Sequence, residues 1–205
     1  MHLLSCRIHS DFIIPYDIEK NFPDSKGGLT QEQVNEHFRN SYNTMKAGTE
    51  GKKLPPTFVF DTNGQKIKLN DLIDQATLIY GTDSHCGWGL VVLESDLPAA
   101  LEKLQRDSVD LFTIALLVRE KTEREESIRC AEIVSENKDK YEHFYIIDRK
   151  QAEKLNIMSA TKMLIDSNQR VVYWNVGASI DPNRIYEELR GLTETPSQLS
   201  EMESP

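Results

Sequence analysis

The sequence predicts an α/β domain, in which helices flank a mixed central sheet. Three observations support this prediction. Strand-like and helix-like segments alternate between residues 57 and 192, which favours helices packed on a sheet. Residues 109–118 form a near-continuous apolar run, which suits a strand that is covered on both faces. A hairpin and a helix close the alternation, so we expect antiparallel strands as well as parallel ones.

Residues 1–49 are predicted to be an N-terminal extension that contains one amphipathic helix. Thr30 and Gln33 have the spacing of a capping box, which marks the start of a helix. The apolar residues that follow at helical spacing are Val34, Phe38, Tyr42 and Met45. Gly48 is expected to end the helix. We therefore expect the apolar face of this helix to pack against the domain.

The main domain is predicted to span residues 50–192 and to begin with a hairpin. Two β-type runs flank Asn63-Gly64, a dipeptide that favours a tight hairpin turn. A short helical turn at 70–74 and a buried strand at 76–80 are expected next. Leucines then recur at helical spacing over 90–106. Pro98 either kinks this helix or begins a new helical segment capped by Ser95 or Asp96.

Further elements alternate up to the C-terminal helix. Residues 123–140 are predicted to be a charged helix with Ile128, Ala131 and Val134 on its inner face. The expected elements after it are a strand at 144–147, a short helix at 149–155, a hairpin over 162–176 and a helix that Asp181 caps before Pro182. Residues 193–205 are polar and acidic without a pattern, so we predict a disordered tail.

Composition excludes several classes of function. The net charge of −9 argues against binding of nucleic acid, because that affinity depends on lysine and arginine that neutralise phosphates. No run of eighteen apolar residues is present, so no membrane span is predicted. The content of 39% hydrophobic and 28% charged residues is that of a soluble globular protein. The sequence does not indicate the oligomeric state.

The cysteines give the only signal on the compartment. Cys6, Cys86 and Cys130 are an odd, low number, which fits a reducing compartment better than a disulfide framework. We therefore expect a cytoplasmic protein from the chain as written. Residues 3–6 also have the form of a bacterial lipoprotein cleavage box, although no apolar core precedes them. The bacterial cell envelope is the alternative, if the start of the chain is recorded too far downstream.

Cys86 is the strongest candidate for chemistry. It lies in the loop between an apolar strand candidate and a helix-like segment. Near a helix N-terminus, backbone N–H groups and the macrodipole favour thiolate over thiol. A protonated His85 would stabilise the thiolate further, and Trp88 could form a wall of the site. The alternative interpretation is a buried and inert cysteine.

Three segments resemble the thioredoxin fold, in its thiol-disulfide-reductase and peroxiredoxin-like branch. They are residues 56–72 (PTFVFDTNGQKIKLNDL), residues 78–88 (LIYGTDSHCGW) and residues 160–174 (ATKMLIDSNQRVVYW). The first resembles the entry hairpin of that branch, the second its strand and active-site cysteine, and the third its final hairpin. The resemblance covers roughly residues 50–192. It implies a three-layer sandwich with a mixed central sheet, and redox chemistry at Cys86.

The sequence departs from this family at the active site. The second cysteine of the C-x-x-C motif is replaced by Gly89. The family's cis-proline aligns with Ala160, which follows Ser159. Because a non-proline cis bond costs about 2.5–4 kcal/mol, we expect a trans bond and a loop of different shape. The resemblance implies that Ser159, Ala160 and Trp88 contact the substrate.

The peroxiredoxin signature also fails. It would need proline where Ile79 stands and threonine where Asp83 stands, and Thr82 is one position away from the required place. A reacted Cys86 would need a second thiol to resolve it. Cys130, on the helix after the central strand, is the candidate within the domain. Cys6 and an external thiol are the other options.

Metal binding has little support in the sequence. His85, Cys86 and His143 are suitable ligand types, but they have no paired spacing. We therefore expect neither a metal nor another cofactor.

Two functions follow from these observations. The first is a redox protein that acts through Cys86 as a thiol-disulfide oxidoreductase or thiol peroxidase, on protein thiols, protein disulfides or peroxide. The alternative is a non-catalytic module that binds a protein or peptide partner along the former active-site groove.

Overall fold

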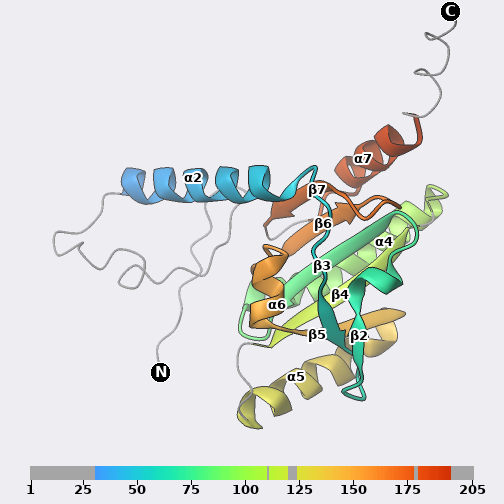
Figure 1. Cartoon of the computed structure of the whole chain (residues 1–205). Coiled ribbons are helices and arrows are strands. Elements are labelled where there is room, and N and C mark those ends of the chain that lie inside the picture. Colours follow the sequence, from blue (N-terminus) through green and yellow to red (C-terminus); the bar gives the residue numbers. More distant parts are fainter. Residues whose placement is uncertain (1–30, 110, 120–123, 178–179, 195–205) are drawn as a thin grey trace, which may run out of the picture.

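A computed structural model describes residues 31–109, 111–119, 124–177 and 180–194. These residues form a seven-stranded mixed sheet with the strand order β2-β1-β5-β4-β3-β6-β7 (Figure 1). The strands are β1 (Phe58–Phe60), β2 (Lys66–Lys68), β3 (Thr77–Asp83), β4 (Phe112–Arg119), β5 (His143–Asp148), β6 (Thr161–Ile165) and β7 (Val171–Val176). β4 is the central strand, and β3 lies between β4 and β6 and is entirely buried, as expected for a strand covered on both faces.

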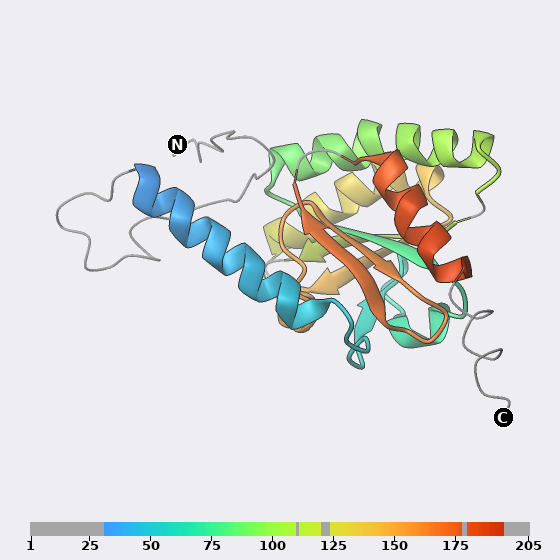
Figure 2. The ribbon, with the colours of Figure 1, turned by 90° about the horizontal axis from the view of Figure 1, so that it is seen from above.

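Helices cover both faces of the sheet, which makes a three-layer sandwich (Figure 2). The longer helices are α2 (Gln31–Thr49), α4 (Leu97–Arg106), α5 (Arg124–Asn137) and α7 (Pro182–Glu194). The short ones are η1 (Leu69–Leu72), α3 (Gly87–Val91), η2 (Val92–Asp96), η3 (Lys138–Lys140) and α6 (Arg149–Lys154). α4, α5 and α7 pack on one face, and α6 with the end of α2 on the other. The predicted fold class is confirmed. None of the described helices is long and apolar enough to cross a membrane.

The direction of the strands determines which loops meet. β3, β4 and β5 run parallel, so their carboxyl ends lie at one edge of the sheet. β6 runs antiparallel to β3, with Gly81 opposite Thr161. The loop that leads into β6 therefore lies at the same edge as the loop that follows β3. This edge holds Cys86 and the Ser159-Ala160 segment.

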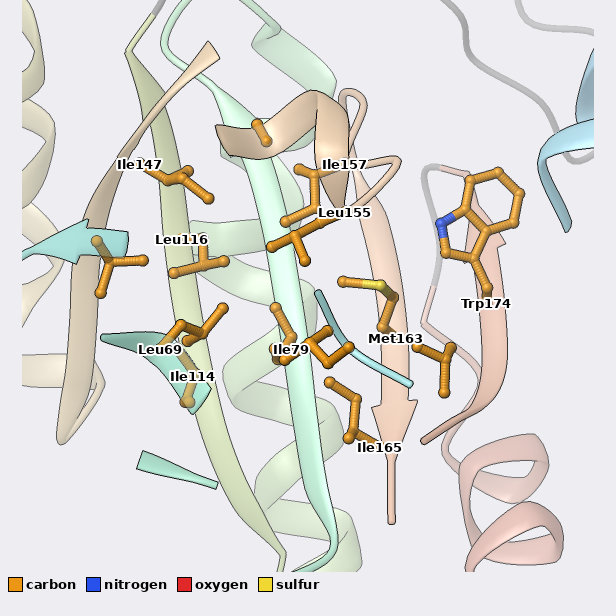
Figure 3. Close-up of a cluster of buried hydrophobic side chains, with 14 of the residues drawn as sticks. Leu69, Ile79, Ile114, Leu116, Ile147, Leu155, Ile157, Met163, Ile165 and Trp174 are labelled. Carbon is orange, nitrogen blue, oxygen red and sulfur yellow. The ribbon is translucent and has the colours of Figure 1, made fainter. Parts of the chain in front are cut away.

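The face under α6 is filled by apolar side chains from the sheet and from the segments that cover this face (Figure 3). Ile79, Ile114 and Met163 project from three neighbouring strands into this cluster. Trp174 is fully buried at its margin and donates its indole N–H to the Asn156 carbonyl at 3.1 Å. The Tyr42 ring lies 5.4 Å from the Trp174 ring, so α2 contacts the domain through its C-terminal half.

The opposite face also has an apolar cluster, but it contains polar groups. Tyr80 on β3 and Lys162 on β6 are register partners on this face, and both are buried. The Lys162 ammonium donates to the Gly177 carbonyl at 2.7 Å. Burial lowers the pKa of Lys162 to about 8, because desolvation penalises the charged form.

The structure corrects the predicted inner face of α5. Ile128 is 49% exposed and Ala131 is also exposed, whereas both were expected to face inward. Among residues 128–137 of α5, for which side-chain burial is described, the buried ones are Cys130, Ile133, Val134 and Asn137. Their spacing is that of a single helical stripe. Buried Asn137 donates its side-chain amide N–H to the Ile133 carbonyl at 3.0 Å. Because one of the four buried residues is polar, the spacing of apolar residues alone did not indicate this face of the helix.

Two further differences lie on either side of Cys86. β3 continues to Asp83, three residues beyond the strand predicted at 76–80. α3, η2 and α4 follow one another without a break, and Pro98 is the second residue of α4. The predicted side-chain cap by Asp96 is wrong, because Asp96 makes no such hydrogen bond. Instead the chain passes through the π turn of η2 before Pro98.

The other predicted elements of the domain are present in the described residues. Gly64 has a φ of +80° in the first hairpin, and the Asp181 carboxylate accepts the Asn183 N–H at 3.0 Å at the start of α7. The division of the chain into extension, domain and tail stays a prediction. The predictions for residues 1–30 and 195–205 lie outside the described residues.

Candidate functional site

Cys86 caps the first turn of the helical segment that follows β3. Its sulfur accepts the backbone N–H of Gly89 at 3.3 Å. Only Ser84 and His85 separate it from the end of β3, so the strand fixes its position closely. The residue is 4% exposed. An N–H donated to sulfur favours the thiolate, whereas burial opposes it.

Hydrogen bonds within the loop before Cys86 and to two other segments hold this loop in place. The buried Asp83 carboxylate accepts the His85 backbone N–H at 2.9 Å and the Ser159 hydroxyl. Arg129 on α5 donates Nε–H to the Ser84 carbonyl at 2.6 Å. His85 Nδ1 lies 3.0 Å from the Ser84 hydroxyl. The loop is therefore attached through Ser159 to the segment that leads into β6, and through Arg129 to α5.

The Ser159-Ala160 segment adopts the trans form that the sequence predicts, since the described residues contain no cis peptide bond. Ala160 has a φ of +58°, a value that proline, with φ near −65°, cannot adopt. Its carbonyl accepts the Gly177 N–H at 3.2 Å. Both residues are buried, so a substrate that contacts them would require the segment to open.

Apolar side chains are exposed on the outer side of α3. Trp88 is 39% exposed and Val91 is also exposed. Residues three apart on a helix share a face, so these two side chains form a small apolar surface next to Cys86. Trp88, which was predicted to form a wall of the site, thus lies on an outward-facing surface.

The inner side of the first turn contacts the Tyr80 hydroxyl. Tyr80 donates to the Gly89 carbonyl at 2.7 Å. Burial, together with the nearby Cys86, raises the pKa of Tyr80 well above its usual value. Tyr80 therefore stays a neutral hydroxyl under Cys86 at all physiological pH values.

The other predicted site residues lie elsewhere. Cys130 is buried in the cluster that also contains Leu93 and Leu97, and both described cysteines are thiols. His143 begins β5 opposite Ile114, near the other end of the sheet from Cys86. The structure thus separates His143 from the two other suggested metal ligands. Among the described residues no group of three or more histidine, cysteine, aspartate or glutamate side chains could hold a metal ion.

Sequence reasoning missed Arg129, the Asp83–Ser159 contact and the role of Tyr80. Asp83 could have been noticed as a carboxylate at a strand end, close to the cysteine. Arg129 had no local signal, because it lies in a charged helix where an arginine is ordinary. Tyr80 was assigned to the strand, but its hydroxyl partner depends on the turn of α3.

Comparison with known proteins gives a fold but no sequence family. No family model and no curated protein matches this sequence. ScoI from Arabidopsis thaliana, solved with copper bound, is 16% identical with a TM-score of 0.53, over 68% of this chain and 99% of its own. Yeast Sco1 is 15% identical with a TM-score of 0.53, over 69% and 96%. A domain of a possible thiol-disulfide isomerase from Cytophaga hutchinsonii is 17% identical with a TM-score of 0.51, over 70% and 95%. The chain therefore has the thioredoxin-like fold, as its resemblance to that fold predicts.

Proposed function

We propose that this protein is a thiol-disulfide oxidoreductase that acts through a single cysteine, Cys86. One observation supports this most directly: the Cys86 sulfur caps a helical turn and accepts the Gly89 N–H at 3.3 Å. A donated N–H stabilises the negative charge of the attacking thiolate. The resemblance of residues 78–88 to the strand and active-site cysteine of thiol-disulfide reductases also supports the proposal.

The reaction needs two exchange steps at Cys86. The Cys86 thiolate attacks one sulfur of a protein disulfide, the substrate S–S bond breaks, and the substrate leaves as a thiolate. An external thiolate then attacks the substrate sulfur of the resulting mixed disulfide, the S–S bond to Cys86 breaks, and Cys86 leaves as a thiolate. The substrate is then disulfide-bonded to the external thiol, and a second external thiol supplies the remaining electrons that reduce it. The exposed surface of Trp88 and Val91 would contact the protein substrate.

Two variations of this chemistry remain proposals. Cys130 could act as the resolving thiol, which would require it to leave the cluster in which it is buried, because the Cα atoms of a disulfide lie within about 7 Å. Peroxide could be the oxidant, since it is small enough to reach a residue that is 4% exposed. The thiolate would then break the O–O bond, release water and become a sulfenate.

The alternative is a module that binds a protein or peptide partner without catalysis. The burial of Cys86, Ser159 and Ala160 favours it, because exchange requires access to sulfur. The deciding quantity is therefore the reactivity of Cys86 in the folded protein.

Alkylation of Cys86 tests the proposal. Iodoacetamide labelling is followed by mass spectrometry across a pH series in the wild type and in Cys130→Ser, with Cys86→Ser as the control. We expect Cys86 to be labelled under native conditions and to form a mixed disulfide with a peptide disulfide. If it is labelled only after unfolding, the binding module is the better description.

Peroxide treatment separates the variations. A Cys86–Cys130 disulfide in the digest would identify Cys130 as the resolving thiol. Sulfinate at Cys86, without a crosslink, would leave resolution to an external thiol.

A further inference from the structure

The site has no room for a second side chain at position 89. A Cβ atom added to Gly89 would lie 1.9 Å from the Thr82 hydroxyl oxygen and 3.0 Å from the Thr82 Cβ. Thr82 is fully buried in β3, and a β-branched side chain has few alternative rotamers. The same added Cβ would lie 3.4 Å from the Cys86 sulfur. The Thr82 hydroxyl and the Cys86 sulfur thus face each other across the space of the missing side chain.

Thr82 belongs to a pair of buried hydroxyls under this turn. Alternate residues of a strand point to the same face, so Thr82 and Tyr80 both project toward α3. The Thr82 hydroxyl donates to the Asp83 carbonyl at 3.5 Å, and Tyr80 donates to the Gly89 carbonyl at 2.7 Å. The Tyr80 hydrogen bond therefore connects β3 to the residue whose N–H binds the Cys86 sulfur, and Thr82 fills the space beside that residue.

We infer that Thr82 and Tyr80 are positioning residues of a site built for one sulfur. The Thr82 hydroxyl fills the space that a side chain at position 89 would need, and the pair holds the Gly89 peptide against Cys86. The site therefore differs from a two-cysteine site by more than one substitution. The backbone of α3 and the Thr82 side chain of β3 also leave no space for a second thiol. This inference rests on the proposed function for its chemical meaning, but its first test does not depend on turnover.

The first test restores a C-x-x-C sequence with and without room for it. Gly89→Cys alone is compared with Thr82→Ala/Gly89→Cys, and Thr82→Ala is the matched control for the effect of the cavity on stability. Each protein is oxidised with diamide, and the disulfide between Cys86 and the thiol introduced at position 89 is quantified by mass spectrometry. We expect the double variant to form this disulfide and Gly89→Cys to form several-fold less, or to fold poorly where the double variant folds.

The outcomes separate this inference from the proposed function. If Gly89→Cys forms the disulfide as readily as the double variant, or if neither forms it, Thr82 does not control this space and the inference fails. A wild-type Cys86 that resists alkylation would contradict the proposed function, while the disulfide comparison could still be made.

The second test measures positioning through the pH profile of Cys86 alkylation. Tyr80→Phe keeps the ring but removes the hydroxyl that donates to the Gly89 carbonyl, and Tyr145→Phe makes the same change on β5 as the matched control. A hydrogen bond of ordinary strength corresponds to roughly a three- to tenfold effect, so we expect Tyr80→Phe to be alkylated more slowly by that factor at neutral pH. Tyr145→Phe should remain close to the wild type. A Tyr80→Phe profile that overlays the wild type would overturn the positioning role, whatever the stability of the variant.

Discussion

The two faces of the sheet bury different chemistry. The face under α6 holds a cluster of apolar side chains around Met163 and Trp174. Both faces also bury hydrogen-bonded polar side chains, such as Asn70 and Thr77 on the side of α6. Among the described residues, however, only the face under α3 and α4 buries an ammonium group, that of Lys162, together with the hydroxyls of Tyr80 and Thr82. Buried polar groups are costly unless they are satisfied. The difference indicates that the face under α6 mainly stabilises the fold. On the face under α3 and α4, the burial of polar groups lowers the free energy of unfolding but shapes the surroundings of Cys86.

The largest expected effect comes from the apolar face. Trp174→Ala removes a fully buried ring and the donor to the Asn156 carbonyl, so we expect a loss of about 3–5 kcal/mol in the free energy of unfolding. Urea denaturation measures this loss. Native alkylation of Cys86 should keep the wild-type pH profile in the folded fraction. A changed profile would show that the two faces are not independent.

Lys162 tests the cost on the polar face. Its pKa is lowered by burial to about 8, against 10.5 in the unfolded chain, so the unfolded state binds more protons between these values. Stability should therefore rise with pH across this window. Relative to Lys162→Met, the wild type should gain about 2 kcal/mol between about pH 7 and about pH 9.5.

Denaturation at several pH values in this range measures the gain. Lys154, exposed on α6, provides the matched control: Lys154→Met should change the pH dependence little. The range should end before the buried tyrosines matter, because their raised pKa values lower stability at higher pH. If the free energy of unfolding changed with pH equally in the wild type and in Lys162→Met, burial of the Lys162 ammonium would not lower stability as proposed.

The smallest effect on stability is expected at the exposed surface. Trp88→Ala should change the free energy of unfolding by less than about 0.5 kcal/mol, in contrast to Trp174→Ala. It should nevertheless slow mixed-disulfide formation with a protein disulfide, while the rate with a small disulfide stays the same. Equal slowing with both substrates would mean that Trp88 shapes the thiol itself rather than a docking surface.

The periodicity of the sequence was sufficient for the order of the elements. Apolar runs and turn residues such as Asn63-Gly64 act locally, so the hairpins, the central strand and the position of Cys86 could be predicted. The inner face of α5 could not, because buried Asn137 and exposed Ile128 reverse the usual relation between polarity and burial. Their places depend on which neighbour each helix face meets.

Much of the candidate site was also beyond local reasoning. The Asp83–Ser159 contact joins residues 76 positions apart, and the Arg129 bond to Ser84 joins residues 45 apart. Such pairs become neighbours only when β6 and α5 are placed beside β3. The close approach of Thr82 to Gly89 depends in addition on the backbone of α3. Thr82 was noted in the sequence only as a threonine one position out of place.

The π turn of η2 has a mechanical consequence. A π turn usually weakens a helix, because its hydrogen bonds are wider spaced. Here the Leu93 carbonyl accepts the Tyr141 hydroxyl, and the Glu94 carbonyl accepts the Lys140 ammonium at 3.1 Å. The segment that joins α5 to β5 thus stabilises the π turn in the continuous helical segment formed by α3, η2 and α4. A displacement of the C-terminal end of α4 would therefore move the Cys86 turn as well, because the helical segment would not bend at the π turn.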